Sequence, residues 1–248
     1  MKKLIDHLPN TITMLNLLSG TLAIVYALEG ELGYAGFLIL IAGIMDFLDG
    51  FTARVLKAHS DIGKELDSLA DVVSFGVAPA LIVFTLMKKA LPGLNLPLSD
   101  ITASFGNWLY LLSPFMIPLF SALRLAKFNI DERQTVNFIG MPTPANAFLW
   151  ASLAVFYTYT TSPAITVLLF TSRNILITVI ITSLLLVSEL PMFSMKFTGL
   201  SFTENWYRYL FLAVSALLLI FLKLTGLPLI IPLYIILSVT FYLLKVIY

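Results

Sequence analysis

The stretch D-F-L-D-G-F-T-A-R-V-L-K-A-H-S-D-I-G-K-E-L-D-S-L-A-D, residues 46–71, has two closely spaced aspartates at each end: Asp46 and Asp49, and Asp67 and Asp71. Long apolar segments flank it, with G-F-L-I-L-I-A-G-I-M before it and V-V-S-F-G-V-A-P-A-L-I-V-F after it. A carboxylate near bilayer depth costs about 2.5–3.5 kcal/mol on insertion scales. Four of them in so short a stretch require a compensating positive charge, and one or two divalent metal ions are the simplest source.

The composition is that of a membrane protein. Of the 248 residues, 59% are hydrophobic and 12% are charged, whereas soluble domains carry about 25% charged residues. The net charge of +1 offers no broad basic surface for nucleic acid. The absence of cysteine excludes disulfides, thiolate metal sites and cysteine nucleophiles, and two histidines make a histidine-rich metal site unexpected.

Apolar segments between turn-forming residues predict about eight transmembrane helices, because a helix needs roughly 20 residues to cross a bilayer. They cover residues 12–29, 33–55, 66–87, 105–126, 144–161, 173–190, 206–223 and 227–246. The expected fold class is therefore an all-α, polytopic membrane helix bundle. We expect one integral membrane domain over residues 1–248, and no cleavable signal peptide.

The distribution of basic residues predicts the orientation. With the N-terminus in the cytoplasm, the far side receives only Lys88, Lys89, Arg173 and Lys223, and the other eleven of the fifteen basic residues face the cytoplasm. We therefore expect a protein of the cytoplasmic (inner) membrane with both termini in the cytoplasm. The turn that carries the aspartates would face the same side.

The spacing of the aspartates favours a shared metal site. Asp46 and Asp49 are three residues apart, and Asp67 and Asp71 are four apart, so each pair occupies one helix face. Two antiparallel helices can direct both pairs into one space. An all-carboxylate site favours Mg²⁺, Mn²⁺ or Ca²⁺ over Zn²⁺ or Cu²⁺, and paired metal ions recur in phosphoryl chemistry.

The pattern resembles the signature of the CDP-alcohol phosphatidyltransferases, D-x-x-D-G-x-x-A-R, eight residues, G-x-x-x-D-x-x-x-D. The fixed positions are all matched, by Asp46, Asp49, Gly50, Ala53, Arg54, Gly63, Asp67 and Asp71. The resemblance implies a six-helix core, a homodimer, two divalent ions (Mg²⁺ or Mn²⁺) and a CDP-linked lipid donor. It implies that all four aspartates bind metal, that Asp71 is also the base, and that Gly50, Ala53 and Arg54 line the CDP site. We assign Gly63, Asn10, Thr13 and Asn16 to the donor site with them.

Other stretches are similar to the bacterial and archaeal phosphatidylserine synthases within that family. They are L-P-N-T-I-T-M-L-N-L-L-S-G from Leu8, A-L-R-L-A-K-F-N from Ala122, F-I-G-M-P-T-P-A-N-A from Phe138 and L-L-V-S-E-L-P-M-F-S-M-K-F from Leu185. These matches place a catalytic core at about 8–197, followed by two additional spans at about 206–246.

The implied reaction joins CDP-diacylglycerol and L-serine to give phosphatidylserine and CMP. The serine hydroxyl would attack the lipid-side phosphorus while Asp71 takes its proton. Serine's carboxylate needs a cationic partner, for which Arg124 is the first candidate, with Lys127 and Asn129 beside it. The sequence leaves open whether the donor lipid has acyl or isoprenoid chains.

Several alternatives stay open at this point. The aspartates could form salt bridges with Arg54, Lys57 and Lys64, and Arg124 and Lys127 could be ordinary membrane anchors. The asparagine and threonine positions in the first span could be helix caps or interhelical hydrogen bonds, and Asn129 could end its helix.

Rival functions also remain. A phosphatidylglycerophosphate or phosphatidylinositol-phosphate synthase would need a denser basic pocket for its phosphorylated acceptor. A divalent-cation transporter would need polar groups continuing across the membrane, but beyond Asp71 the third span has only Ser74 as a polar residue before Thr85.

Overall fold

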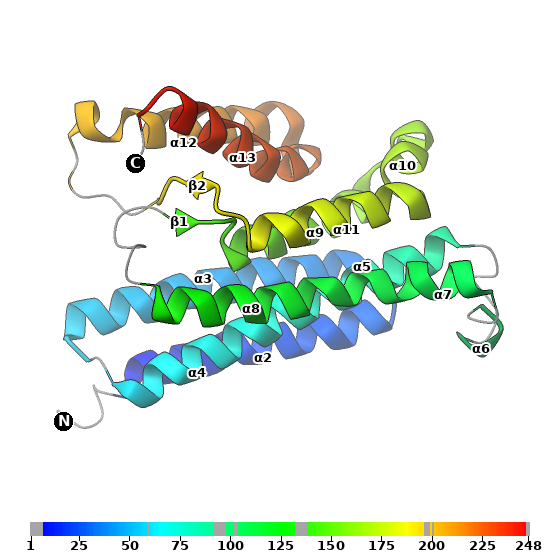
Figure 1. Cartoon of the computed structure of the whole chain (residues 1–248), viewed down its shortest axis with the longest axis horizontal. Helices are drawn as coiled ribbons and strands as arrows, with labels where there is room; N and C mark the ends of the chain where they lie inside the picture. The colour runs from blue at the N-terminus through cyan, green and yellow to red at the C-terminus, as the bar shows by residue number, and fades with distance from the viewer. Residues whose placement is uncertain are drawn as a thin grey trace.

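A computed structural model describes residues 7–58, 60–91, 98–101, 104–131, 138–195, 199 and 201–246. Nearly all of these residues are helical, which confirms the all-α fold class. The α-helices are α2 (Leu8–Leu28), α3 (Leu32–Leu56), α4 (Asp61–Asp71), α5 (Ala78–Ala90), α6 (Leu98–Ile101), α7 (Phe105–Leu112), α8 (Met116–Ile130), α9 (Thr143–Tyr159), α10 (Pro163–Leu169), α11 (Ser172–Leu186), α12 (Phe202–Leu222) and α13 (Leu227–Leu243). Figure 1 shows them as an elongated bundle with the N- and C-termini at the same end.

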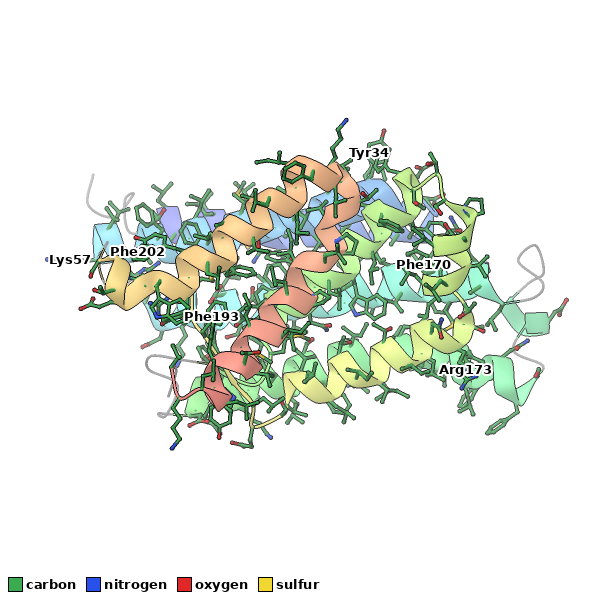
Figure 2. All side chains as sticks on the ribbon, turned by 90° about the horizontal axis from the view of Figure 1, so that it is seen from above. Tyr34, Lys57, Phe170, Arg173, Phe193 and Phe202 are labelled. Atoms are coloured by element: carbon green, nitrogen blue, oxygen red, sulfur yellow. The ribbon has the colours of Figure 1, made fainter. Side chains whose placement is uncertain are left out.

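Five helical segments of the described residues are long and apolar enough to cross a membrane, and the bent pair α10–α11 would make a sixth. The difference from eight has two causes. Helix α9 has only 17 residues, and residues Phe202–Leu243 form one continuous helical segment. A 3-10 turn at Lys223–Gly226 divides that segment, and α13 folds back beside α12 (Figure 2). The chain is an integral membrane protein.

Small residues allow the central helices to approach closely, as is common between membrane helices. A Cβ added at Gly36 of α3 would lie 2.5 Å from the carbonyl oxygen of Ala151 in α9. One added at Gly20 of α2 would lie 2.6 Å from the Cα atom of Ser74. Helix α3 therefore packs nearly backbone to backbone against α9, and α2 packs in the same way against the segment that contains Ser74.

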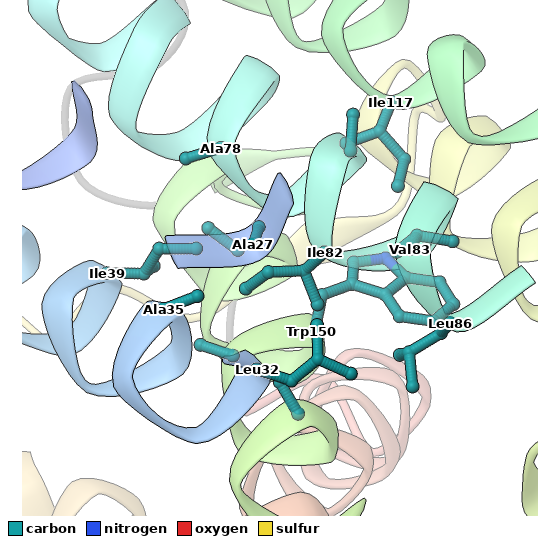
Figure 3. Close-up of a cluster of buried hydrophobic side chains, with 14 of the residues drawn as sticks. Ala27, Leu32, Ala35, Ile39, Ala78, Ile82, Val83, Leu86, Ile117 and Trp150 are labelled. Atoms are coloured by element: carbon teal, nitrogen blue, oxygen red, sulfur yellow. The ribbon is translucent and has the colours of Figure 1, made fainter. Parts of the chain in front are cut away.

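The main core lies among α2, α3, α5 and α9. Trp150 of α9 is buried against Ile82, Val83 and Leu86 of α5, as Figure 3 shows. Leu32 of α3 belongs to the same cluster. This packing supports the end of the bundle away from the aspartates and holds the long helices in register.

The predicted third span is not a uniform α-helix. A π-helical segment, η1 (Val72–Val77), begins immediately after Asp71 and separates α4 from α5. π-helical turns are rare and occur frequently at functional sites. A second interruption is the 3-10 turn η2 (Ser113–Phe115), which contains Pro114 and joins α7 to α8.

Two short strands lie at the edge of the bundle. Strand β1 (Phe138–Ile139) pairs antiparallel with β2 (Pro191–Met192), so that Phe138 faces Met192 and Ile139 faces Pro191. Helical periodicity does not predict this pairing, since the two partners are about 50 residues apart and each strand has only two residues.

Candidate active site

The turn between α3 and α4 brings the two aspartate pairs together. Helix α3 ends at Leu56 and is capped by Lys57, whose backbone is left-handed at φ 51°. The amide of Ala58 donates to the carbonyl of Ala53 at 3.0 Å. Helix α4 begins after Ser60, whose hydroxyl accepts a hydrogen bond from the Gly63 amide at 3.0 Å. Ser60 is therefore the N-cap of α4.

Three of the aspartates form a carboxylate cluster. Oxygens of Asp46, Asp49 and Asp67 lie within 4.8 Å of one another. Asp49 is buried, and Oδ2 of Asp49 and Oδ1 of Asp67 are buried without a hydrogen-bond partner. Unpartnered, buried carboxylate oxygens at this separation fit a hard divalent cation, which prefers an all-oxygen ligand set.

Asp71 lies in the same cavity but outside that cluster. Its Oδ1 accepts a hydrogen bond of 3.4 Å from Nδ2 of Asn16, and it is largely buried. The backbone of Asn16 is held in turn, because the hydroxyl of Ser74 donates to the Asn16 backbone carbonyl at 3.1 Å. The π-helical segment thus supports, through Ser74 and Asn16, the carboxylate that precedes it.

Most of the predicted site residues line one cavity of about 710 Å³. They are Asp46, Asp49, Asp67, Asp71, Gly50, Ala53, Arg54, Gly63, Asn10, Thr13, Arg124 and Asn129. Two predicted residues are not among its lining. Asn16 is fully buried behind Asp71, as the interhelical hydrogen-bond alternative predicted, and Lys127 lines a second cavity of about 370 Å³.

The two signature glycines have different surroundings. A Cβ at Gly50 would meet no atom within 4 Å, so this position leaves open space beside the carboxylates. A Cβ at Gly63 would lie 2.8 Å from Oδ1 of Asn10 and 3.0 Å from the hydroxyl of Ser60. Gly63 therefore allows α2 to approach the start of α4. Arg54 donates from Nε to the Gly50 carbonyl at 3.0 Å.

The salt-bridge alternative is not seen within the described ranges. No ion pair is found there between the four aspartates and Arg54, Lys57 or Lys64. The sequence predicts that Thr13 either contacts the CDP-linked lipid or caps a helix. Thr13 is not a cap, because its hydroxyl donates to the Pro9 carbonyl one turn back inside α2.

Arg124 lies between the two cavities and lines both. Its side chain is 94% buried, and Nε and one terminal nitrogen have no hydrogen-bond partner. The guanidinium carbon is 4.9 Å from the ring centroid of Phe128 and 5.7 Å from that of Phe138. Two aromatic rings thus hold a buried cation whose donors remain available to an anionic ligand.

Ser68, Phe128 and Phe138 are among the lining residues that the sequence did not predict. Ser68 accepts a hydrogen bond of 3.0 Å from Nδ2 of Asn129, which joins α4 to α8, so Asn129 does more than end its helix. Phe128 and Phe138 cover Arg124. Ser68 could have been found from its position one residue after Asp67, but no local pattern marks the two aromatic residues.

The strand pair unites two stretches that are far apart in sequence. Gly140 follows β1 with a left-handed φ of 76°, and its amide donates to the Leu190 carbonyl at 2.9 Å. The amide of Met141 donates to the Leu185 carbonyl, also at 2.9 Å. The stretches that begin at Phe138 and Leu185 therefore meet beside Arg124, where the first borders both cavities and the second borders the smaller one.

With this geometry, comparison with known proteins gives a consistent result. The profile of the CDP-alcohol phosphatidyltransferase family matches residues 6–187, and the chain belongs to that family. It is 36% identical over 139 residues to the CDP-diacylglycerol–serine O-phosphatidyltransferase of Bacillus subtilis, covering 56% of this chain and 70% of the relative.

Two further relatives support the same branch. The chain is 39% identical over 147 residues to the Mycobacterium leprae CDP-diacylglycerol–serine O-phosphatidyltransferase. It is 36% identical over 143 residues to the archaetidylserine synthase of Methanothermobacter thermautotrophicus. Each match covers 56% of this chain, but only 44% and 54% of the respective relative, so the chain spans about half the length of these two proteins.

Proposed function

We propose that this protein transfers a phosphatidyl group from CDP-diacylglycerol to the hydroxyl of L-serine, giving phosphatidylserine and CMP. The observation that carries the proposal is one cavity that joins the carboxylate cluster to the buried cation Arg124. The names of the relatives favour serine as the acceptor.

The residues have distinct roles in this proposal. Asp46, Asp49, Asp67 and Asp71 hold the divalent ions, Mg²⁺ or Mn²⁺, which when bound would neutralise diphosphate charge and stabilise the departing CMP. The serine oxygen forms a bond to the lipid-side phosphorus as the bond from that phosphorus to the CMP oxygen breaks. Asp71 takes the hydroxyl proton, and Asn16 orients the Asp71 carboxylate.

The donor and the acceptor approach from different parts of the cavity. The nucleotide lies along the signature residues, where Gly50 leaves space and Asn10, Thr13, Ala53, Arg54 and Gly63 form the lining. Arg124 holds the serine carboxylate with its unpartnered donors, Asn129 borders the same space, and Lys127 contributes positive potential from the neighbouring cavity.

In this proposal the cavity faces the cytoplasm, where CDP and serine are available, and both termini lie on that side. Figure 1 supports a shared side for the termini and the cavity, since both termini lie at one end of the bundle together with the α3–α4 turn. The single membrane domain, its core over about 8–197, its additional spans over about 206–246 and its assembly as a homodimer also remain proposals.

An acceptor panel tests the assignment. Purified protein receives CDP-diacylglycerol, Mg²⁺ or Mn²⁺, and either serine, glycerol 3-phosphate or inositol phosphate, and CMP release is measured. Release with serine alone is expected, and release with glycerol 3-phosphate but not serine would overturn the assignment. A parallel reaction with an isoprenoid ether donor decides the lipid class.

The metal assignment has a test that does not depend on turnover. Addition of Mn²⁺ to metal-free protein should raise the melting temperature, because a ligand that binds the folded state stabilises it. The increase should be lost in Asp49→Ala and kept in Asp100→Ala, an exposed control in α6. An equal increase in both variants would remove these carboxylates from the metal site.

A further inference from the structure

Side chains of the C-terminal helices α12 and α13 form hydrogen bonds with the backbone directly after β2. The hydroxyl of Tyr234 in α13 donates to the Phe193 carbonyl at 2.9 Å. Nε of Arg208 in α12 donates to the Ser194 carbonyl at 2.7 Å, and its Nη1 donates to Oδ1 of Asn205 at 2.6 Å. All five residues are buried. Two consecutive backbone carbonyls are thus held by side chains from two helices.

The Phe193 side chain is enclosed by the same two helices. Its ring centroid is 4.8 Å from that of Tyr234, 5.6 Å from Tyr207, 5.8 Å from Phe211 and 6.1 Å from Phe241. Figure 2 shows Phe193 in the opening between α12 and α13. Tilted and edge-on aromatic contacts of this kind add stability beyond burial alone. The segment after β2 is therefore anchored by both its backbone and its ring.

This anchored segment connects to the proposed acceptor site through the strand pair. Phe193 follows Met192, which pairs with Phe138 of β1, and the Phe138 ring lies 5.7 Å from the Arg124 guanidinium. Each strand has two residues, and an isolated strand pair is at best marginally stable in water. The position of Phe138 therefore depends on support from outside the strands.

We propose that Tyr234 and Arg208 are positioning residues for acceptor binding, a role that rests on the proposed function. By fixing the Phe193 and Ser194 carbonyls they hold β2 against β1, and so hold Phe138 over Arg124. The family match ends at residue 187, so the contacts of Tyr234 and Arg208 with the Phe193 and Ser194 carbonyls lie beyond it. This gives the two additional helices a function in catalysis besides crossing the membrane.

The test removes one hydrogen bond and keeps the aromatic ring. In Tyr234→Phe the KM for serine should rise about fivefold, the effect of losing one buried hydrogen bond, with the KM for CDP-diacylglycerol changed by less than about twofold. Hydrogen–deuterium exchange should be faster in peptides that contain the Gly140 and Met141 amides. Tyr242→Phe, on the exposed side of the same helix, should change neither quantity.

A second variant checks that the changes in KM and in exchange are not specific to Tyr234→Phe. Arg208→Lys keeps the charge but cannot reproduce the Arg208 donor geometry, and it should shift the same KM and the same exchange. Unchanged exchange in Tyr234→Phe, or equal changes in both KM values, would overturn the positioning role. If the acceptor panel identifies an acceptor other than serine, the KM for that acceptor is compared with the KM for CDP-diacylglycerol. The hydrogen–deuterium exchange result does not depend on the acceptor.

Discussion

At the scale of single residues, the site combines groups that are costly inside a membrane. Three carboxylates lie within 4.8 Å of one another, and two of their oxygens have no hydrogen-bond partner. Arg124 is a buried cation with free donors. A structure retains such groups where ligands complete them, and in the proposed function the ligands are a divalent metal and a carboxylate-bearing acceptor.

Asp71 provides the sharpest prediction about chemistry. Asp71→Asn keeps the size of the side chain but removes the base, so kcat should fall by about 10²–10⁴-fold. Binding of CDP-diacylglycerol should largely survive. The matched control is Asp100→Asn, which changes an exposed carboxylate in α6. Turnover of Asp71→Asn near that of the control would exclude Asp71 as the base.

Arg124 and Lys127 should differ in their effects on serine. Arg124→Ala should raise the KM for serine by about tenfold or more, because a charge-assisted contact to the carboxylate is lost. Lys127→Ala should have a smaller effect, since Lys127 faces the second cavity. Steady-state kinetics with each substrate varied provides the comparison. Equal increases in both KM values for Arg124→Ala would assign this residue to the nucleotide or to folding.

At the scale of elements, the α3–α4 corner and the π-helical segment determine where the carboxylates lie. The left-handed Lys57 ends α3, Ser60 caps α4, and η1 begins after Asp71. The aspartate spacing and the Ser60 cap could be read from the sequence, because both depend on residues within one turn. The π-helix could not be read from the sequence, and its contacts from Ser74 to Gly20 and to the Asn16 backbone join segments that are far apart in the chain.

The two signature glycines should separate folding from binding. Gly63→Ala places a methyl group 2.8 Å from Oδ1 of Asn10, so the melting temperature should fall, with a loss of about 1–3 kcal/mol in stability. Gly50→Ala adds a methyl group in open space, so stability should change little while the KM for CDP-diacylglycerol rises. A Gly50→Ala variant that melts early yet binds donor normally would contradict this division.

At the scale of the whole molecule, hydropathy predicted most of the helices but not the long-range contacts between them. Each predicted span corresponds to a helix or a helix pair, because apolar length is a local property. The strand pair and the hydrogen bonds that hold the Phe193 and Ser194 carbonyls were not predicted, since both connect residues far apart in sequence. The same reason explains why Phe128 and Phe138 were missed beside Arg124.

The orientation can be tested directly because the chain has no cysteine. Lys57→Cys and Arg173→Cys introduce single thiols at residues that lie toward opposite ends of the molecule (Figure 2). A membrane-impermeant maleimide applied to intact cells should label the thiol at position 173 and reach position 57 only after permeabilisation. The reverse pattern would place the cavity on the outer face.

The central claim is that the aspartate cavity joins serine to the phosphatidyl group. The most direct measurement supplies isotope-labelled serine and CDP-diacylglycerol to the purified protein and quantifies labelled lipid and CMP by mass spectrometry. We predict labelled phosphatidylserine in a one-to-one ratio with CMP, and neither product above background from Asp71→Asn. CMP release without labelled lipid, or labelled lipid formed by Asp71→Asn at the wild-type rate, would contradict the claim.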